Sequence, residues 1–356
     1  GFYCRYRKQS RYKRLNKNKM SQKALRSPQY INVTAAANTL STELKILIDG
    51  TLRYTINKNT TAGSNVIFEW AELARDYFNL SFSGPYTIPE LTVRLQIRGF
   101  AGANGTGDPS ENIVDTTVKA VNGWGTFMEG SNPSIPFAPR TSPAWLVCSQ
   151  NSAGQSQIFV PIGKSGKSQY MQDESQGNEI TNQDYSTTDI DIGGEGEITE
   201  VLKINRIDCT KYGTGTQFTF QNKFGMYQDI WFFLKEVKKL NRTSETFQRN
   251  IVNPAATTSS NNFYNVNEPA KKSFNTEGHQ SNTFSSGYYP EEANCMFEQL
   301  ILSTHVYMHR PKGSTFEIVP VMVKSSDLVY KTSLNDKLIE YTIEFEDAFD
   351  YINNIR

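Results

Sequence analysis

The segment Gly215–Leu240 constrains the fold of this chain more than any other. Its first half alternates apolar Phe218 and Phe220 with polar residues, and the turn-forming Asn222–Gly225 leads into an aromatic run at Asp229–Leu234. Alternation of this kind, interrupted by a turn, predicts a β-hairpin. Because an isolated hairpin is only marginally stable in water, its aromatic side chains need further strands to cover them.

Other alternating runs can supply those strands. They occur at residues 197–209 and within residues 297–346, and the clearest separate hairpin is Glu43–Ile56, where Asp49-Gly50 offers a type I′ turn. We therefore expect a mainly β fold, made of antiparallel β-sandwich modules with one or two short helices and long polar loops or arms.

Two segments show helical spacing of apolar residues. Residues 69–82 place one apolar stripe on a helix that would pack on the N-terminal sheet, and residues 341–356 change from a strand pattern to a short helix. The stripe of the first consists of Trp70, Leu73, Ala74, Tyr77 and Phe78, and that of the second consists of Phe345, Phe349 and Ile352.

Shifts in composition predict the organisation of the domains. Residues 163–196 contain almost no large aliphatic side chains and are therefore expected to form a loop. The predicted parts are a basic N-terminal arm at 1–24, an N-terminal β domain with one packed helix at 25–162, a polar loop at 163–196, a C-terminal β-sandwich domain at 197–248 and 295–356, and an inserted extended arm at 249–294.

The inserted segment 249–294 is too long and too polar for an ordinary connection inside a compact domain. Aromatic residues are nevertheless spaced along it, and such a segment becomes ordered when its rings pack on a neighbouring subunit. The alternative is a flexible excursion with no partner. The predicted assembly anchors are Phe263, Tyr264, Phe274, Phe284, Tyr288 and Tyr289.

The charge of the chain is unevenly distributed. The formal net charge is +1, but residues 1–19 carry eight basic side chains and no acidic one, which leaves about −7 on the remainder. Basic residues interleaved with Tyr6 and Tyr12 are typical of an arm that contacts nucleic acid, although Met20 could instead be the true start. The predicted contacts are Arg5, Arg7, Arg11, Lys13 and Arg14.

One acidic segment resembles a metal-binding loop. Residues 189–200 match the calcium loop of helix–loop–helix proteins at its first, third, sixth and twelfth positions, but neither flank is helical. The candidate Ca²⁺ ligands are Asp189, Asp191 and Glu200, and the alternative is a plain acidic turn.

Catalytic patterns are weak, and we expect no enzymatic activity. The segment Gly163–Ser168 follows a strand, but Pro161 stands where a phosphate-binding loop needs its first glycine. The chain has three histidines and no GxSxG motif, and its four cysteines are far apart, which predicts reduced thiols. No apolar run is long enough for membrane insertion.

The motifs QNKFGMYQDIWFFLKEVKK and NRTSETFQRNI, together with the C-terminal SSDLVYKTSLNDKLIEYTIEFEDAFDYINNIR, resemble structural proteins of tailed bacteriophages. The resemblance is to tail or baseplate proteins, particularly from phages of Bacteroidetes. It implies a virion component made in the host cytoplasm, most simply a tail, baseplate or neck subunit. Such a subunit would form a ring with copies of itself by strand and arm exchange and would contact other virion structural proteins.

Two other functions are compatible with the sequence. A receptor- or carbohydrate-binding module at a tail tip would use Trp124, Trp145 and the glycine-rich loop at residues 99–107 as a stacking surface, although tryptophans are more often part of the core. An internal virion protein would contact nucleic acid through residues 1–19.

Overall fold

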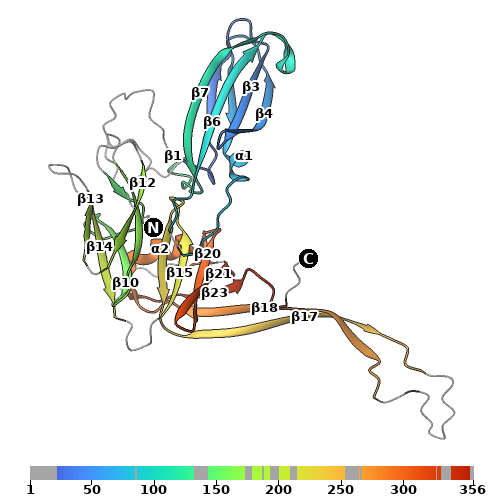
Figure 1. The fold of residues 1–356 in the computed structure, drawn as a ribbon, viewed down its shortest axis with the longest axis vertical. Coiled ribbons are helices and arrows are strands. Elements are labelled where there is room, and N and C mark those ends of the chain that lie inside the picture. Colours follow the sequence, from blue (N-terminus) through green and yellow to red (C-terminus); the bar gives the residue numbers. More distant parts are fainter. Residues whose placement is uncertain are drawn as a thin grey trace.

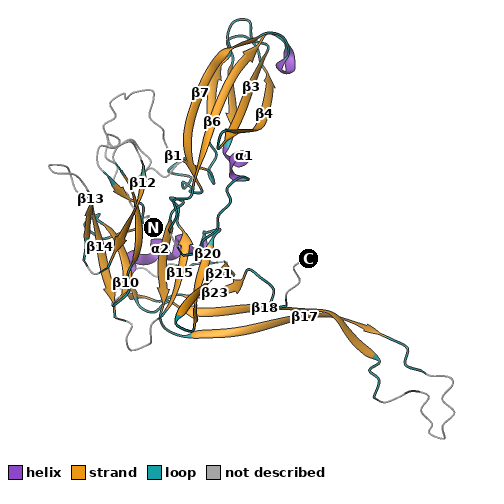
Figure 2. Ribbon diagram, viewed as in Figure 1, coloured by secondary structure: helices purple, strands orange, loops and turns teal. Residues whose placement is uncertain are grey.

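The structure is a computed structural model that describes residues 22–84, 86–131, 143–172, 179–186, 188–192, 200–208, 215–252, 264, 267–325, 327–329 and 338–352. As predicted, the fold is mainly β: several sheets, most of them antiparallel, surround two short α-helices in the described residues (Figure 2). A narrow N-terminal sheet points away from a wider body, and one long ribbon leaves the body in another direction (Figure 1).

The N-terminal part is a sandwich of two sheets. Its five-stranded sheet has the order β1-β7-β6-β3-β4, and the pair β2–β5 and helix α1 share its hydrophobic core. The elements are β1 (Gln22–Ala24), β2 (Tyr30–Thr34), β3 (Ser41–Ile48), β4 (Thr51–Asn59), β5 (Asn65–Glu69), α1 (Ala71–Arg75), β6 (Glu90–Phe100), the 3₁₀ turn η1 (Ala103–Gly105) and β7 (Pro109–Val121). Strand β1 pairs with β7 in parallel, and the other strands of the larger sheet are antiparallel.

The hairpin predicted at Glu43–Ile56 is confirmed as β3–β4. Asp49 and Gly50 have φ angles of 47° and 80°, which are the positive values that a type I′ turn requires. The predicted helix exists but is shorter than its apolar stripe, because only Ala71–Arg75 is α-helical. Tyr77 and Phe78 follow it in an irregular segment and still pack against the core.

The middle of the chain forms two small sheets that share one core. The first has the order β13-β14-β10-β9 and the second β12-β11-β8, and Trp145, Ile158, Tyr185 and Leu202 pack between them. The elements are β8 (Ala144–Trp145), β9 (Ser149–Gln150), β10 (Ser156–Pro161), β11 (Gly166–Met171), β12 (Ile180–Tyr185), β13 (Ile190–Ile192) and β14 (Glu200–Ile207).

The prediction of a polar loop at residues 163–196 is therefore wrong, since β11, β12 and β13 lie within it. Some of the buried polar side chains there find partners inside the protein. Gln169 is 1% exposed, and its Oε1 accepts a hydrogen bond from the backbone nitrogen of Tyr227 at 3.1 Å.

The predicted hairpin within Gly215–Leu240 is also confirmed, as β15–β16. It forms one edge of a seven-stranded antiparallel sheet with the order β16-β15-β20-β21-β23-β18-β17. The elements are β15 (Thr216–Gln221), β16 (Tyr227–Phe232), β17 (Glu236–Gln248), β18 (Lys271–Ser285), β20 (Val306–Lys312), β21 (Thr315–Val323) and β23 (Thr342–Asp347), with the small pair β19 (Tyr289–Pro290) and β22 (Leu338–Ile339) beside them.

The second helix is not where the sequence predicts it. Residues 342–347 form β23, and residues 348–352 contain no helix; instead, α2 (Asn294–Ile301) follows the 3₁₀ turn η4 (Glu291–Ala293).

The prediction of reduced thiols is wrong for Cys295, which is disulfide-bonded, whereas Cys148 is a buried free thiol.

The largest core cluster lies between the seven-stranded sheet and α2. Phe218 is at its centre: its ring stacks on Phe345 with centroids 4.3 Å apart and contacts the rings of Phe232 and Phe284 edge-on, each at 5.1 Å. These rings come from β15, β16, β18 and β23, so one cluster joins the β15–β16 hairpin to two strands that are distant from it in sequence.

The N-terminal sheet is attached to the body at the turn of the β15–β16 hairpin. Asn122, just after β7, donates to the buried Gln221 side chain at 2.7 Å, and the Lys223 ammonium pairs with Glu129 at 2.9 Å. A Cβ added at Gly123 would lie 2.6 Å from the carbonyl oxygen of Lys223, so this position needs a glycine. The turn is thus part of the joint between the two regions.

We expect Phe218→Ala to lower the free energy of unfolding by about 3–5 kcal/mol, because it leaves a cavity where four strands meet. Phe316→Ala, at a 60% exposed ring on the β20–β21 hairpin, should cost less than about 0.5 kcal/mol. Urea denaturation of both variants measures the difference. Equal losses would contradict this description of the core.

Candidate assembly surface

The most unusual feature of the molecule is a two-stranded ribbon, which we call the arm and define as β17, β18 and the described residues 249–252, 264 and 267–270. Strand β17 pairs with β18 along its length, whereas β23 pairs only with Ser281–Ser285 of β18. Residues 271–280 of β18 therefore extend beyond the sheet by about 33 Å, at roughly 3.3 Å per residue. Figure 1 shows the arm running away from the body.

The sequence favours a ribbon here because both strands are rich in Thr, Ser, Asn and charged residues, which suit a surface in contact with water. An irregularity in the pairing between Thr243 and Glu245 is a bulge of the kind that bends and twists a strand pair. Beyond it, an Arg249–Glu268 ion pair of 2.8 Å joins the two strands.

The arm also exposes large apolar side chains that bury little surface in their own chain. Phe247 and Phe274 form an edge-to-face pair with centroids 5.6 Å apart, and they are 44% and 47% exposed. Lys272 lies opposite Phe247 in the register, and Lys271 follows opposite Gln248. We call Phe247, Phe274, Lys271 and Lys272 the arm tip cluster. The other exposed apolar residues of the arm are Val237, Leu240, Val252 and Tyr264.

Among the described residues, both edges of the arm offer hydrogen-bonding groups that pair with no other strand. No described strand pairs with the outer edge of β17, and on the outer edge of β18 the tail contributes one bond, from Tyr351 N to Gly278 O at 2.7 Å. Unpaired edges invite strand addition, and charged residues such as Lys238 and Lys239 limit indiscriminate pairing.

The six predicted anchors divide into three groups. Tyr264, Phe274 and Tyr288 are exposed, and Phe263 lies outside the described residues. Phe284 and Tyr289 are wrong as anchors for a neighbour, because they are buried in the core of their own chain.

The burial of these two residues has a clear cause. Phe284 lies opposite Ile343 where β18 joins the sheet, and the Tyr289 hydroxyl donates to the Trp231 carbonyl oxygen at 2.7 Å. The predicted bounds of 249–294 are likewise shifted, since they omit β17 and include η4 and the start of α2. The apolar residues of β17, Val237, Leu240 and Phe247, were missed, although the polar, Thr-rich pattern of residues 236–248 is compatible with an exposed strand.

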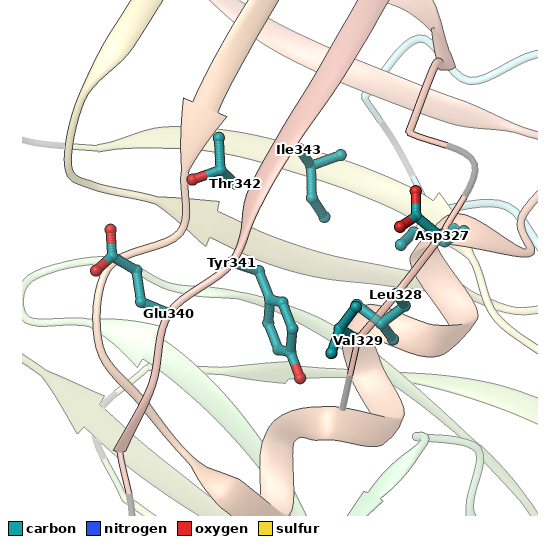
Figure 3. A pocket seen from close by; sticks show the side chains of 8 residues that line it. Asp327, Leu328, Val329, Glu340, Tyr341, Thr342 and Ile343 are labelled. Carbon is teal, nitrogen blue, oxygen red and sulfur yellow. The ribbon is translucent and has the colours of Figure 1, made fainter. Parts of the chain in front are cut away.

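A pocket of about 390 Å³ lies at the base of the arm (Figure 3). Its walls come from the end of α2, from residues 327–329 and from the start of β23. The lining residues are Ile301, Asp327, Leu328, Val329, Glu340, Tyr341, Thr342 and Ile343. Tyr341 is held in place because its hydroxyl donates to Asn294 Oδ1 at 2.6 Å and its backbone nitrogen donates to Ser286 Oγ at 2.9 Å. The pocket thus has a mixed lining, in which aliphatic side chains alternate with the carboxylates of Asp327 and Glu340.

The predicted metal ligands do not come together. Asp189 is held by Lys203 at 2.6 Å and by the backbone nitrogen of Ile204 at 2.9 Å, and these contacts hold the pKa of its carboxyl below the usual range. Asp191 is on β13 and Glu200 is on β14, where Glu200 accepts a bond from Ser156. No three His, Cys, Asp or Glu side chains of the described residues form a metal-binding group. Asp189, Asp191 and Glu200 therefore form no metal-binding group among the described residues, and calcium binding by a loop that includes residues 193–199, which lie outside them, stays a prediction.

The proposed carbohydrate-stacking surface is not assembled either. Trp145 is 2% exposed in the core between the two middle sheets. The glycine-rich loop precedes β7 and Trp124 follows it, so the length of β7, about 40 Å, separates them.

The basic residues Arg5, Arg7, Arg11, Lys13 and Arg14 lie outside the described residues, and the nucleic-acid contact stays a prediction.

A buried polar cluster lies where the N-terminal, middle and C-terminal regions meet. Thr219 Oγ1 donates to Asp229 Oδ1 at 2.6 Å and contacts His309 Nε2 at 2.8 Å. Burial raises the pKa of the Asp229 carboxyl and lowers that of His309, and Tyr86 and Tyr185 are the other titratable groups close to Asp229. Asp229 is 7% exposed, so it is poorly placed to act on a substrate.

Comparison with protein-family models, curated proteins and solved structures gives no match, so no relative identifies the function of this chain. In the part of the chain that the structure describes, no helix is both long enough and apolar enough to cross a membrane.

Asp229→Asn should stabilise the protein at neutral pH. The folded protein holds the Asp229 proton more tightly than the unfolded chain does, so wild-type stability falls as the pH rises from about 4 through the raised pKa. Asparagine has no such proton. The melting temperature of the variant should match that of wild type near pH 4 and exceed it increasingly at higher pH. The same change at the exposed Asp191 is the control, and a constant difference at every pH would contradict the prediction.

Stability measurements can also test which aromatic residues of the arm are exposed and which belong to the core. Phe247→Ser with Phe274→Ser should change the free energy of unfolding by less than about 1 kcal/mol, because the pair is exposed. Phe284→Ala on the same strand as Phe274 should cost about 3–5 kcal/mol, because Phe284 is in the core. A large loss in the first variant would mean that the ribbon folds against its own body.

Proposed function

We propose that this chain is a structural subunit that assembles with copies of itself, and that it serves as a tail, baseplate or neck component of a phage virion. The observation that supports this most is the arm: an ordered ribbon projects beyond its sheet and carries exposed rings and unpaired strand edges.

The energetics of the arm favour contact with a partner. An isolated two-stranded ribbon is marginal in water, and the exposed part of the aromatic residues on it contributes stabilisation only when another surface covers it. Obligate subunit interfaces commonly bury more than about 2,000 Å², and an arm that lies across a neighbour adds area that the body alone lacks. Strand addition at its edges supplies main-chain hydrogen bonds in the same contact.

The resemblance to phage tail and baseplate proteins is compatible with this role and gives it a location in the virion. The described residues contain no built metal-binding group, and the cluster around Asp229 is buried. A role in binding other subunits therefore explains more of the described features than a catalytic role does.

We expect the purified wild-type chain to self-associate at micromolar concentration, and negative-stain images to show closed rings. Phe247→Ser with Phe274→Ser should weaken self-association by at least about 100-fold, because each buried phenyl ring contributes about 2 kcal/mol. Analytical ultracentrifugation over a concentration series measures this.

Phe316→Ser is the matched control, since that ring is exposed but lies off the arm. A wild-type chain that stays monomeric at the highest concentrations would overturn the proposed assembly role. Unchanged association of the double variant would mean that the arm is not the connecting element.

A further inference from the structure

We propose that the pocket at the base of the arm receives the arm tip cluster of a second copy of this chain. The inference rests on the assembly role proposed above and identifies the partner surface for that role. Both halves of the contact are present on every copy: exposed rings with lysines beside them on the arm, and a pocket of mixed aliphatic and acidic lining at its base.

The arm does not reach its own pocket. Ser285 of β18 is opposite Thr342, a pocket residue, and the Ser285 hydroxyl donates to the Glu340 carboxylate. Phe274 is eleven residues further along the same strand, or about 36 Å away at 3.3 Å per residue. The tip could return only if the whole β17–β18 ribbon bent back sharply towards its own sheet. A tip in this pocket therefore belongs to another copy.

The sizes of the two parts match. A cavity of about 150 Å³ accepts one benzene ring, so a pocket of about 390 Å³ has room for both rings of the Phe247–Phe274 pair. Three residues of the lining, Ile301, Leu328 and Val329, supply aliphatic surface for the rings, and the largely buried Tyr341 completes the lining. Figure 3 shows Tyr341, Leu328 and Val329 directed toward the same space.

The charges are complementary as well. Lys272 lies on the same face of the ribbon as the two rings and Lys271 lies on the other face, while Asp327 and Glu340 line the pocket. In Figure 3 the two carboxylates lie on opposite sides of Tyr341. Charges of opposite sign around an apolar centre orient an interface and exclude wrong partners, and like charges in their place are costly.

The geometry of the contact also sets the symmetry of the assembly. The tip and the pocket are different surfaces, so the contact is heterologous: each copy gives its tip to one neighbour and accepts the tip of another. Such head-to-tail contacts form rings when the rotation closes and filaments when it does not. Head-to-tail assembly, as a ring or a filament, thus follows from the contact itself.

A charge exchange between tip and pocket tests the inference. Lys271→Glu with Lys272→Glu gives a tip variant, and Asp327→Lys with Glu340→Lys gives a pocket variant. Each alone places like charges together and should weaken self-association about tenfold or more. An equimolar mixture should assemble again, because each tip then finds a pocket of opposite charge on the other variant. Lys238→Glu with Lys239→Glu, on the arm but away from the tip, is the control.

A direct distance test avoids any effect of charge on folding. One chain carries Phe274→Cys, and a second chain, made heavier by a tag, carries Val329→Cys. Under mild oxidation the two chains should form a disulfide with each other. Both positions are exposed, and circular dichroism verifies that the variants fold. Tyr288→Cys in place of Phe274→Cys is an exposed control at the base of the arm, and it should not cross-link.

The possible failures are distinguishable. If wild type assembles, and neither the charge variants nor their mixture differ from it, the tip–pocket contact is wrong while the assembly role stands. If each variant fails and the mixture fails too, the tip and pocket are not partners of each other. If wild type does not assemble at all, the proposed function is wrong and this inference falls with it.

Discussion

The packing of Phe218 against Phe284 and Phe345 is the contact on which the rest of the structure depends. Phe284 is where the arm strand β18 enters the core, and Phe345 is on β23, the strand that joins β18 to the rest of the sheet. Because these rings are fully buried and close together, the root of the arm is fixed to the body. A ribbon with a fixed root keeps its direction, and this allows its tip to meet a partner without a large loss of conformational entropy on binding.

The same residue pattern has two different outcomes along β18. Phe274 and Phe284 are both phenylalanines in a polar strand, yet one is exposed and the other is in the core. The difference comes from β23, which reaches β18 only at residues 281–285. Strand β18 is therefore buried in the core at its C-terminal end and exposed at its N-terminal end.

Local signals in the sequence were sufficient for much of the fold. The Asp49-Gly50 turn and the alternation around it predict the β3–β4 hairpin, and the Phe218–Phe220 alternation predicts β15, because turn chemistry and side-chain period are properties of neighbouring residues. The strands within residues 163–196 were missed because their residues are mostly polar, and the buried Gln169 accepts its hydrogen bond from Tyr227 of β16, a partner that is distant in sequence. The second helix was misplaced because the Phe345 periodicity also fits a strand.

The candidate site was predictable only in part. Exposed aromatic residues on a long polar segment indicated an assembly arm, but which of them are exposed depends on the register Phe284–Ile343, a pairing between distant parts of the chain. The pocket joins residues from α2, from 327–329 and from β23, so no short motif could reveal it. The acidic segment at 189–200 matched a calcium loop by spacing, and Asp189 pairs instead with Lys203 across the β13–β14 strands.

The most direct test of the central claim, that the arm acts on another copy, is an electron cryomicroscopy reconstruction of the self-assembled chain. The account predicts that the ribbon beyond the bulge at Thr243 and Glu245 leaves its own body and ends against Tyr341 and Val329 of the neighbouring copy. A reconstruction in which that ribbon folds back on its own sheets, or in which copies join through other surfaces while every arm remains free, would contradict it.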